Sequence, residues 1–293
     1  MKARYISVPG DNKKHSEDFS YTGLRKGRLV AAVGDWATNL IGGLYIDRET
    51  ALAFGHSPNT QYSGGSIGAQ IARRVVEKSE STGHKLVGEI NNALAAKYEE
   101  LADRGHEELR NFREDPRLCF TGFLAHVTAT HDEMTLTSVG DVMIYMNGKR
   151  LAGEETKIQR FLNVVRQAYI DATGDINGAY DVIKPIIREQ YRWQNGTHPL
   201  SCASINGNPM PAKGIVTSTI INMPKKHASL LLFSDGYVTP SDLTIEGLED
   251  MLAYVYRVDP YRCKQFPAVG TLKDDRTALE ISLNQNWDAL FIE

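Results

Sequence analysis

The expected strands and helices of this chain occur in blocks and do not alternate singly. Strands open the chain, two helices follow, and further strands, helices and strands come after them. A parallel sheet needs a crossover between successive strands, so this order favours stacked antiparallel sheets with helices outside. The expected strands lie at residues 4–8, 19–22, 28–33, within 118–151, and at 217–223, 229–233 and 277–283. The expected helices lie at residues 66–79, 86–102, 156–172, 179–191 and 245–256.

Local patterns add detail to this α+β prediction. Asn147-Gly148 between apolar runs indicates a hairpin. The strands at 217–223 and 229–233 are expected to pair with each other through the turn at 224–226. Residues 38–65 indicate a long loop that ends in Gly64-Gly65, with Ser66 as the N-cap of the next helix. We expect one domain over 1–293 with this loop as an extension.

Composition excludes several classes of protein. The chain has 293 residues, 24% of them charged, and a formal net charge of -3. This charge does not indicate a basic surface for binding nucleic acid. Its three cysteines are far apart and odd in number, so neither a disulfide framework nor a zinc site is expected. No segment resembles a signal peptide or a membrane span. The expectation is a cytoplasmic protein without membrane or nucleic-acid partners.

Short acidic turns stand where strands are expected to end or begin. A strand that delivers a carboxylate at its tip aims an oxygen ligand at a hard cation. Carboxylates without a cluster of Cys or His favour Mg²⁺ or Mn²⁺. We therefore expect these turns to converge on a divalent metal pair. The turns are Ser16-Glu17-Asp18, Val33-Gly34-Asp35, Val139-Gly140-Asp141, Ser234-Asp235-Gly236 and Lys273-Asp274-Asp275-Arg276-Thr277.

The order and spacing of these motifs resemble the PP2C-type (PPM) family of metal-dependent serine/threonine protein phosphatases. The resemblance runs from Lys13 to Ile281, and its most specific parts are Ser234-Asp235-Gly236 and Asp274-Asp275-Arg276-Thr277. It implies a four-layer fold, a central antiparallel β-sandwich flanked by helical layers. It also implies hydrolysis of phosphoserine and phosphothreonine by a metal-activated water, with a phosphorylated protein as substrate and a cognate Ser/Thr kinase as a partner.

The resemblance also implies a role for each site residue. Asp35 would bridge two Mn²⁺ or Mg²⁺ ions, and Trp36 would offer its backbone carbonyl to the second ion. Asp235 and Asp274 would complete the shell of one ion, and Asp141 would line a weaker third position. Glu17 and Asp18 would hold metal-bound waters. Lys13 would take the place of the family's phosphate-binding arginine.

The chain departs from the family at three places. The family has glycine after the bridging Asp, where this chain has Trp36, and we expect the indole to lie at the cleft as a wall, platform or lid. The family's Gly-Thr-Thr is Phe120-Thr121-Gly122 here, and Val142-Met143 replaces a Ser-Arg pair. These departures keep two other hypotheses open. One is a pseudophosphatase that serves as a binding or regulatory module, and the other is a phosphatase for a small metabolite.

Overall fold

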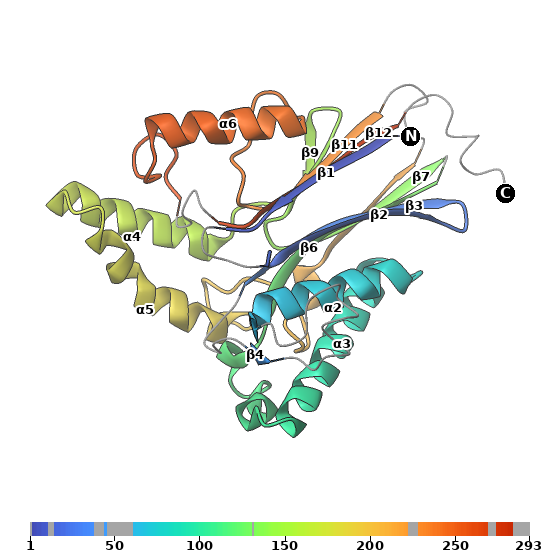
Figure 1. The fold of residues 1–293 in the computed structure, drawn as a ribbon, viewed down its shortest axis with the longest axis horizontal. Coiled ribbons are helices and arrows are strands. Elements are labelled where there is room, and N and C mark those ends of the chain that lie inside the picture. Colours follow the sequence, from blue (N-terminus) through green and yellow to red (C-terminus); the bar gives the residue numbers. More distant parts are fainter. Residues whose placement is uncertain are drawn as a thin grey trace.

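The core of the protein is a sandwich of two antiparallel five-stranded sheets (Figure 1). The computed structural model describes residues 2–10, 15–37, 44–45, 61–130, 132–221, 228–268 and 274–283. The first sheet has the order β1 (Lys2–Val8), β12 (Arg276–Leu283), β11 (Ala228–Phe233), β8 (Met143–Met146) and β9 (Lys149–Ala152). The second has the order β10 (Val216–Ile221), β7 (Glu133–Val139), β6 (Thr121–Ala129), β3 (Arg28–Ala37) and β2 (Asp18–Arg25). A separate short pair joins β4 (Leu44–Tyr45) to β5 (Gln61–Tyr62).

Helices cover both outer faces of the sandwich, which confirms the predicted α+β architecture. In Figure 1, α6 lies over the first sheet and α2 with α3 over the second, while α4 and α5 extend beyond the sheets at one end. The α-helices are α2 (Gly64–Lys78), α3 (Gly83–Asp103), α4 (Lys157–Thr173), α5 (Gly178–Trp193) and α6 (Ile245–Val258). Short 3-10 turns occur at η1 (Glu107–Asn111), η2 (Pro116–Leu118) and η3 (Ala212–Gly214).

The strand β3 shows how the sequence produces these layers. Successive side chains of a strand point to opposite faces. Leu29, Ala31 and Val33 therefore pack between the sheets, whereas Val30 and Ala32 pack toward α2 and α3. Because both faces are covered, β3 is apolar without alternation, as expected of a central strand in a multilayer fold.

The predicted pairing of β10 with β11 is wrong. β10 pairs with β7 in the second sheet, and β11 pairs with β12 and β8 in the first. Both strands are rich in apolar and β-branched residues, and such a strand fits either sheet of a sandwich. Proximity along the chain therefore does not decide the partner here.

Helix α2 begins two residues earlier than predicted. Its N-cap is Ser63 and not the predicted Ser66, which lies inside the helix; the Ser63 side chain accepts a hydrogen bond from the backbone N of Ser66 at 3.1 Å. Gly64 and Gly65 belong to the helix and lie against Phe120 and Glu17, where an added Cβ would overlap the neighbouring side chain. Close packing, and not loop freedom, therefore explains this glycine pair.

Two predictions fall largely outside the described residues. These are the loop at 38–65, apart from β4, β5 and the start of α2, and the phosphate-binding residue Lys13. None of the helices in the described ranges has the length and apolar character needed to cross a bilayer.

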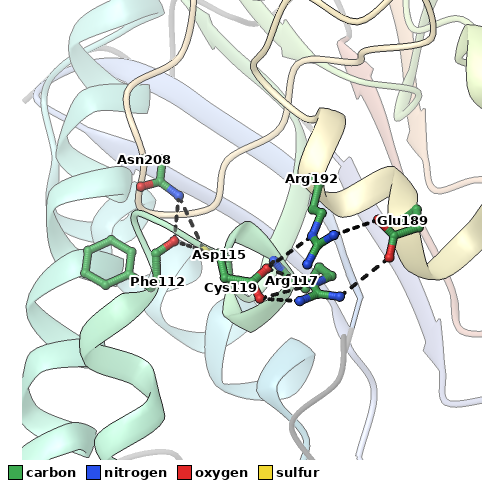
Figure 2. Close-up of polar contacts among 7 residues, drawn as sticks. All are labelled: Phe112, Asp115, Arg117, Cys119, Glu189, Arg192 and Asn208. Carbon is green, nitrogen blue, oxygen red and sulfur yellow. Dashed lines mark hydrogen bonds and ion pairs between the residues drawn. The ribbon is translucent and has the colours of Figure 1, made fainter.

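The α4–α5 hairpin has its own small core and is tied to the body by ion pairs. Ile158, Leu162 and Ile183 form that core. Figure 2 shows the tie, in which Asp115 and Arg117 of the η2 turn meet Glu189 and Arg192 near the end of α5. Two of its ion pairs cross between these elements, at 3.5 Å from Arg117 Nη1 to Glu189 Oε1 and 3.9 Å from Arg192 Nε to Asp115 Oδ1.

Candidate metal centre

A cavity of about 810 Å³ opens at the end of the sandwich that faces α4 and α5. Carboxylates from distant parts of the sequence form one side of it, namely Glu17, Asp35, Asp235, Asp274 and Asp275. A second cavity of about 260 Å³ shares Asp235 and Asp274 and adds Asp141. The fold thus brings residues from all five acidic turns to one place.

Asp18 and Asp35 are directly opposite each other in the antiparallel pair β2–β3. The backbone N of Trp36 donates to the carbonyl of Glu17 at 3.2 Å, so the first two acidic turns are joined through their backbones. The expected end of this strand at Val33, before the Asp35 turn, is wrong, because β3 continues through Asp35 to Ala37. Pairing with β2 and β6 on both sides carries the strand past the carboxylate.

Asp18 links the two sheets through Ser234. The Ser234 hydroxyl donates to Asp18 Oδ2 at 2.7 Å and accepts from the backbone N of Thr277 at 3.0 Å. Burial raises the pKa of Asp18 well above its usual range, and the nearby carboxylates add to this effect. The serine of the Ser-Asp-Gly motif therefore has a structural role of its own.

Asp275 positions the first acidic turn, a role that the sequence did not indicate. Its side chain is 5% exposed and accepts from the backbone N of Glu17 at 2.7 Å and from that of Gly10. The start of β12 is thereby connected to the start of β2. Sequence reasoning selected the neighbouring Asp274, which lines both cavities.

Gln159 connects Asp141 with Asp235. Its amide Nε2 donates to Asp141 Oδ2 at 2.6 Å and to Asp235 Oδ2 at 3.1 Å. The amide oxygen accepts from Thr156 N and Thr156 Oγ1, both at 2.8 Å, in the capping box of α4. Because the capping box fixes the oxygen, the amide must present its N–H groups to the carboxylates. A Thr-x-x-Gln pattern was visible in the sequence, but its link to the acidic turns was not.

Crowding and burial raise the pKa of these acids. Burial raises the pKa of Asp35 well above its usual range, and Asp18, Asp235 and Asp141 raise it further. Burial, followed by the charge of Asp235, raises the pKa of Asp141 to about 8. Carboxylates that repel one another in this way are stabilised by a cation, so the cluster is electrostatically suited to one.

The donor set, made of carboxylate oxygens, fits Mg²⁺ or Mn²⁺. Asp18 Oδ1 and Asp141 Oδ1 are buried and have no hydrogen-bond partner among the described residues, as expected of atoms suited to a cation. Yet within the described part of the chain, no three His, Cys, Asp or Glu side chains are grouped closely enough to hold an ion.

Trp36 borders the larger cavity, but its indole belongs to the hydrophobic core. The side chain is 2% exposed and packs on Phe19 with ring centroids 5.7 Å apart. A Cβ added at Gly68 or Gly122 would overlap the indole ring. A ring buried in this way cannot serve as a platform or lid, and of the expected roles only that of a cavity wall agrees with its position.

The other side of the cavity is formed by the α4–α5 hairpin. Leu162 of α4 and Tyr180, Ile187 and Tyr191 of α5 line it. The cavity thus joins an acidic side to a mixed apolar and aromatic side, a combination typical of sites that bind a ligand with a charged end and a larger body.

The comparisons with known proteins bear on the fold of the chain. The sequence matches no protein-family model and no curated protein. Among solved structures, the serine/threonine phosphatase PstP/Ppp of Mycobacterium tuberculosis is 14% identical, with a TM-score of 0.51, and the match covers 97% of this chain and 98% of that one. A variant of a bacterial serine phosphatase is 11% identical, also with a TM-score of 0.51, covering 97% of this chain and 99% of that one. The chain has the PP2C-type phosphatase fold. This PP2C-type fold agrees with the strand order and helical layers described above.

Proposed function

We propose that this chain is a metal-dependent phosphomonoester hydrolase that removes phosphate from phosphoserine or phosphothreonine in proteins. The observation that carries the proposal is the meeting of Asp35, Asp141, Asp235 and Asp274 at the cavities of a PP2C-type fold. No protein nucleophile is required, because divalent ions supply an activated water and offset the charge of the phosphate when they are bound.

Each site residue has its own role in the proposed reaction. Asp35, with the carbonyl of Trp36, would hold two ions, Asp235 and Asp274 would complete one shell, and Asp141 would serve a third position. Two buried carboxylates, Glu17 and Asp18, would orient waters from behind. Lys13 stays a predicted phosphate ligand.

The apolar side of the cavity supports a protein substrate over a small metabolite. Leu162, Ile187 and Tyr191 extend the binding surface well beyond the volume that a phosphate needs. A phosphopeptide presents side chains next to its phosphate that can cover such a surface. A small phosphorylated metabolite would leave most of it exposed to water.

The alternative, a pseudophosphatase that acts as a binding module, has one observation in its favour. Gln159 already bridges Asp141 and Asp235 with a neutral amide, which stabilises the pair without a cation. In this alternative the cavity would bind a phosphoprotein without cleaving it.

A Mn²⁺-dependent assay with a phosphopeptide separates these functions. We expect turnover in the wild type, none after chelation, and a loss of at least about a hundredfold in Asp35→Asn, since a shared ligand is weakened. Millimolar Mn²⁺ should raise the melting temperature of the wild type, because a ligand of the native state stabilises by mass action. Binding of the phosphopeptide without turnover would instead support the pseudophosphatase.

A further inference from the structure

The second cavity brings a basic side chain to the acidic centre. Arg262, from the segment between α6 and β12, lines it together with Asp141, Glu155, Asp235 and Asp274. Of the described residues that line the two cavities, Arg262 is the only lysine or arginine. The carboxylates of Asp235 and Asp274 act electrostatically on its guanidinium.

The backbone around Arg262 is held by a buried carboxylate. Asp259 is 2% exposed, and its side chain accepts hydrogen bonds at 2.9–3.0 Å from four successive backbone N–H groups, those of residues 263–266. Arg262 itself has a φ of +47°, a conformation that costs energy for a residue other than glycine. The hydrogen bonds of Asp259 to the following backbone therefore hold Arg262 in a conformation that an arginine does not otherwise prefer.

A second arginine fixes this segment to α4. Arg166 donates to the carbonyl of Tyr261 at 2.6 Å, of Arg262 at 2.8 Å and of Ala268 at 3.3 Å. The backbone of Arg262 is thus held from two sides, by its own segment and by α4. Such support is typical of a side chain whose position matters for binding.

The guanidinium keeps donors available for a ligand. Its Nε donates to the carbonyl of Phe266 at 3.4 Å, and no hydrogen bond from Nη1 or Nη2 is present among the described residues. A guanidinium oriented in this way presents a planar pair of N–H groups, the arrangement that matches two phosphate oxygens.

We propose that Arg262 binds the phosphate group of the substrate and of the product in this site. This inference rests on the proposed function, because the carboxylates are then occupied by divalent cations. An arginine beside such cations is repelled by them unless an anion lies between. A phosphate that contacts both removes this repulsion, which accounts for a positive side chain at the edge of a cation site.

Inorganic phosphate is the probe for this proposal. Its affinity for the full-length protein saturated with Mn²⁺ is measured by calorimetry and as product inhibition of phosphopeptide hydrolysis. We expect Arg262→Gln to weaken phosphate binding at least tenfold and to leave Mn²⁺ affinity equal or higher. Arg262→Lys should fall between the two, since a lysine keeps the charge but not the planar pair of donors. Arg257→Gln, at an exposed position of α6, is the matched control and should change neither affinity.

The outcomes are distinguishable. Unchanged phosphate affinity in Arg262→Gln, with Mn²⁺ affinity raised, would mean that Arg262 merely balances the carboxylates, and the inference would be wrong while the proposed function stands. A wild type that binds neither Mn²⁺ nor phosphate would overturn both. Melting curves of the two Arg262 variants establish that they are folded.

Discussion

The two helical pairs, α2–α3 and α4–α5, use similar amphipathic sequences for different purposes. Helices α2 and α3 bury eight and ten of their residues against each other and the second sheet. Helices α4 and α5 bury two each, although their apolar stripes are as regular. The first pair supports the sheet that carries Asp35, and the second forms a side of the cavity.

The difference in burial between the two helical pairs shows that amphipathicity alone does not predict what a helix packs against. Phe161, Val164 and Tyr180 of the α4–α5 hairpin remain exposed, at 40%, 67% and 45%. The hairpin is tied down near η2 by ion pairs, at the junction in Figure 2. Its position is therefore maintained with less buried surface than that of α2–α3.

The largest expected effect tests whether the α2–α3 pair contributes more packing energy than the α4–α5 pair. Leu94→Ala in α3 removes a fully buried side chain and should lower the free energy of unfolding by about 2–5 kcal/mol. Val164→Ala in α4, at an exposed position, should change it by less than about 0.5 kcal/mol. Denaturant unfolding of both variants measures the two values. Equal effects would show that the helical pairs are not as different as their burial indicates.

A second prediction tests whether water is excluded from the interface between the second sheet and the α2–α3 pair. His126 of β6 shares the face of Leu124, and burial lowers its pKa to about 4, with a further contribution from Arg25. Between pH 6.5 and pH 4 the unfolded chain binds this proton and the folded chain does not, so stability falls as the pH falls. The loss amounts to about 3 kcal/mol at pH 4.

Comparison with a variant that cannot titrate isolates this contribution. His126→Gln should show a smaller fall in the free energy of unfolding from pH 7 to pH 4.5 than the wild type does. Parallel curves for the two proteins would mean that water reaches the ring, and the α2–α3 interface would be less closed than described.

The smallest expected effect on stability belongs to the ion-pair tie of the α4–α5 hairpin. Asp115→Ala removes the partner of Arg117 and Arg192, and partly exposed pairs of this kind contribute about 1 kcal/mol or less. Since the hairpin lines the cavity, KM for a phosphopeptide should rise a fewfold with little change in kcat. Asp103→Ala, which breaks the exposed pair with Arg110, is the matched control and should leave KM unchanged. An unchanged KM in Asp115→Ala would show that the tie does not position the cavity wall.

The sequence predicted the layers and the acidic turns because both depend on local patterns. The block order of the expected strands and helices indicated stacked antiparallel sheets, and Asp141 and Asp235 do follow the ends of their strands. The pairing of β10, the extension of β3 past Asp35 and the role of Asp275 were missed, because each depends on which segments meet in space. Gln159 and Arg262 were missed for the same reason, since neither belongs to an acidic turn.

Trp36 and Gly122 are direct neighbours across β3 and β6, and together they constrain how the sequence can change. The family resemblance assigns glycine to position 36 and threonine to position 122, where this chain has tryptophan and glycine. A side chain at Gly122 would collide with the indole, whereas a glycine at position 36 alone would leave a void. We therefore expect positions 36 and 122 to be energetically coupled, and a double-mutant cycle at these positions should be strongly non-additive.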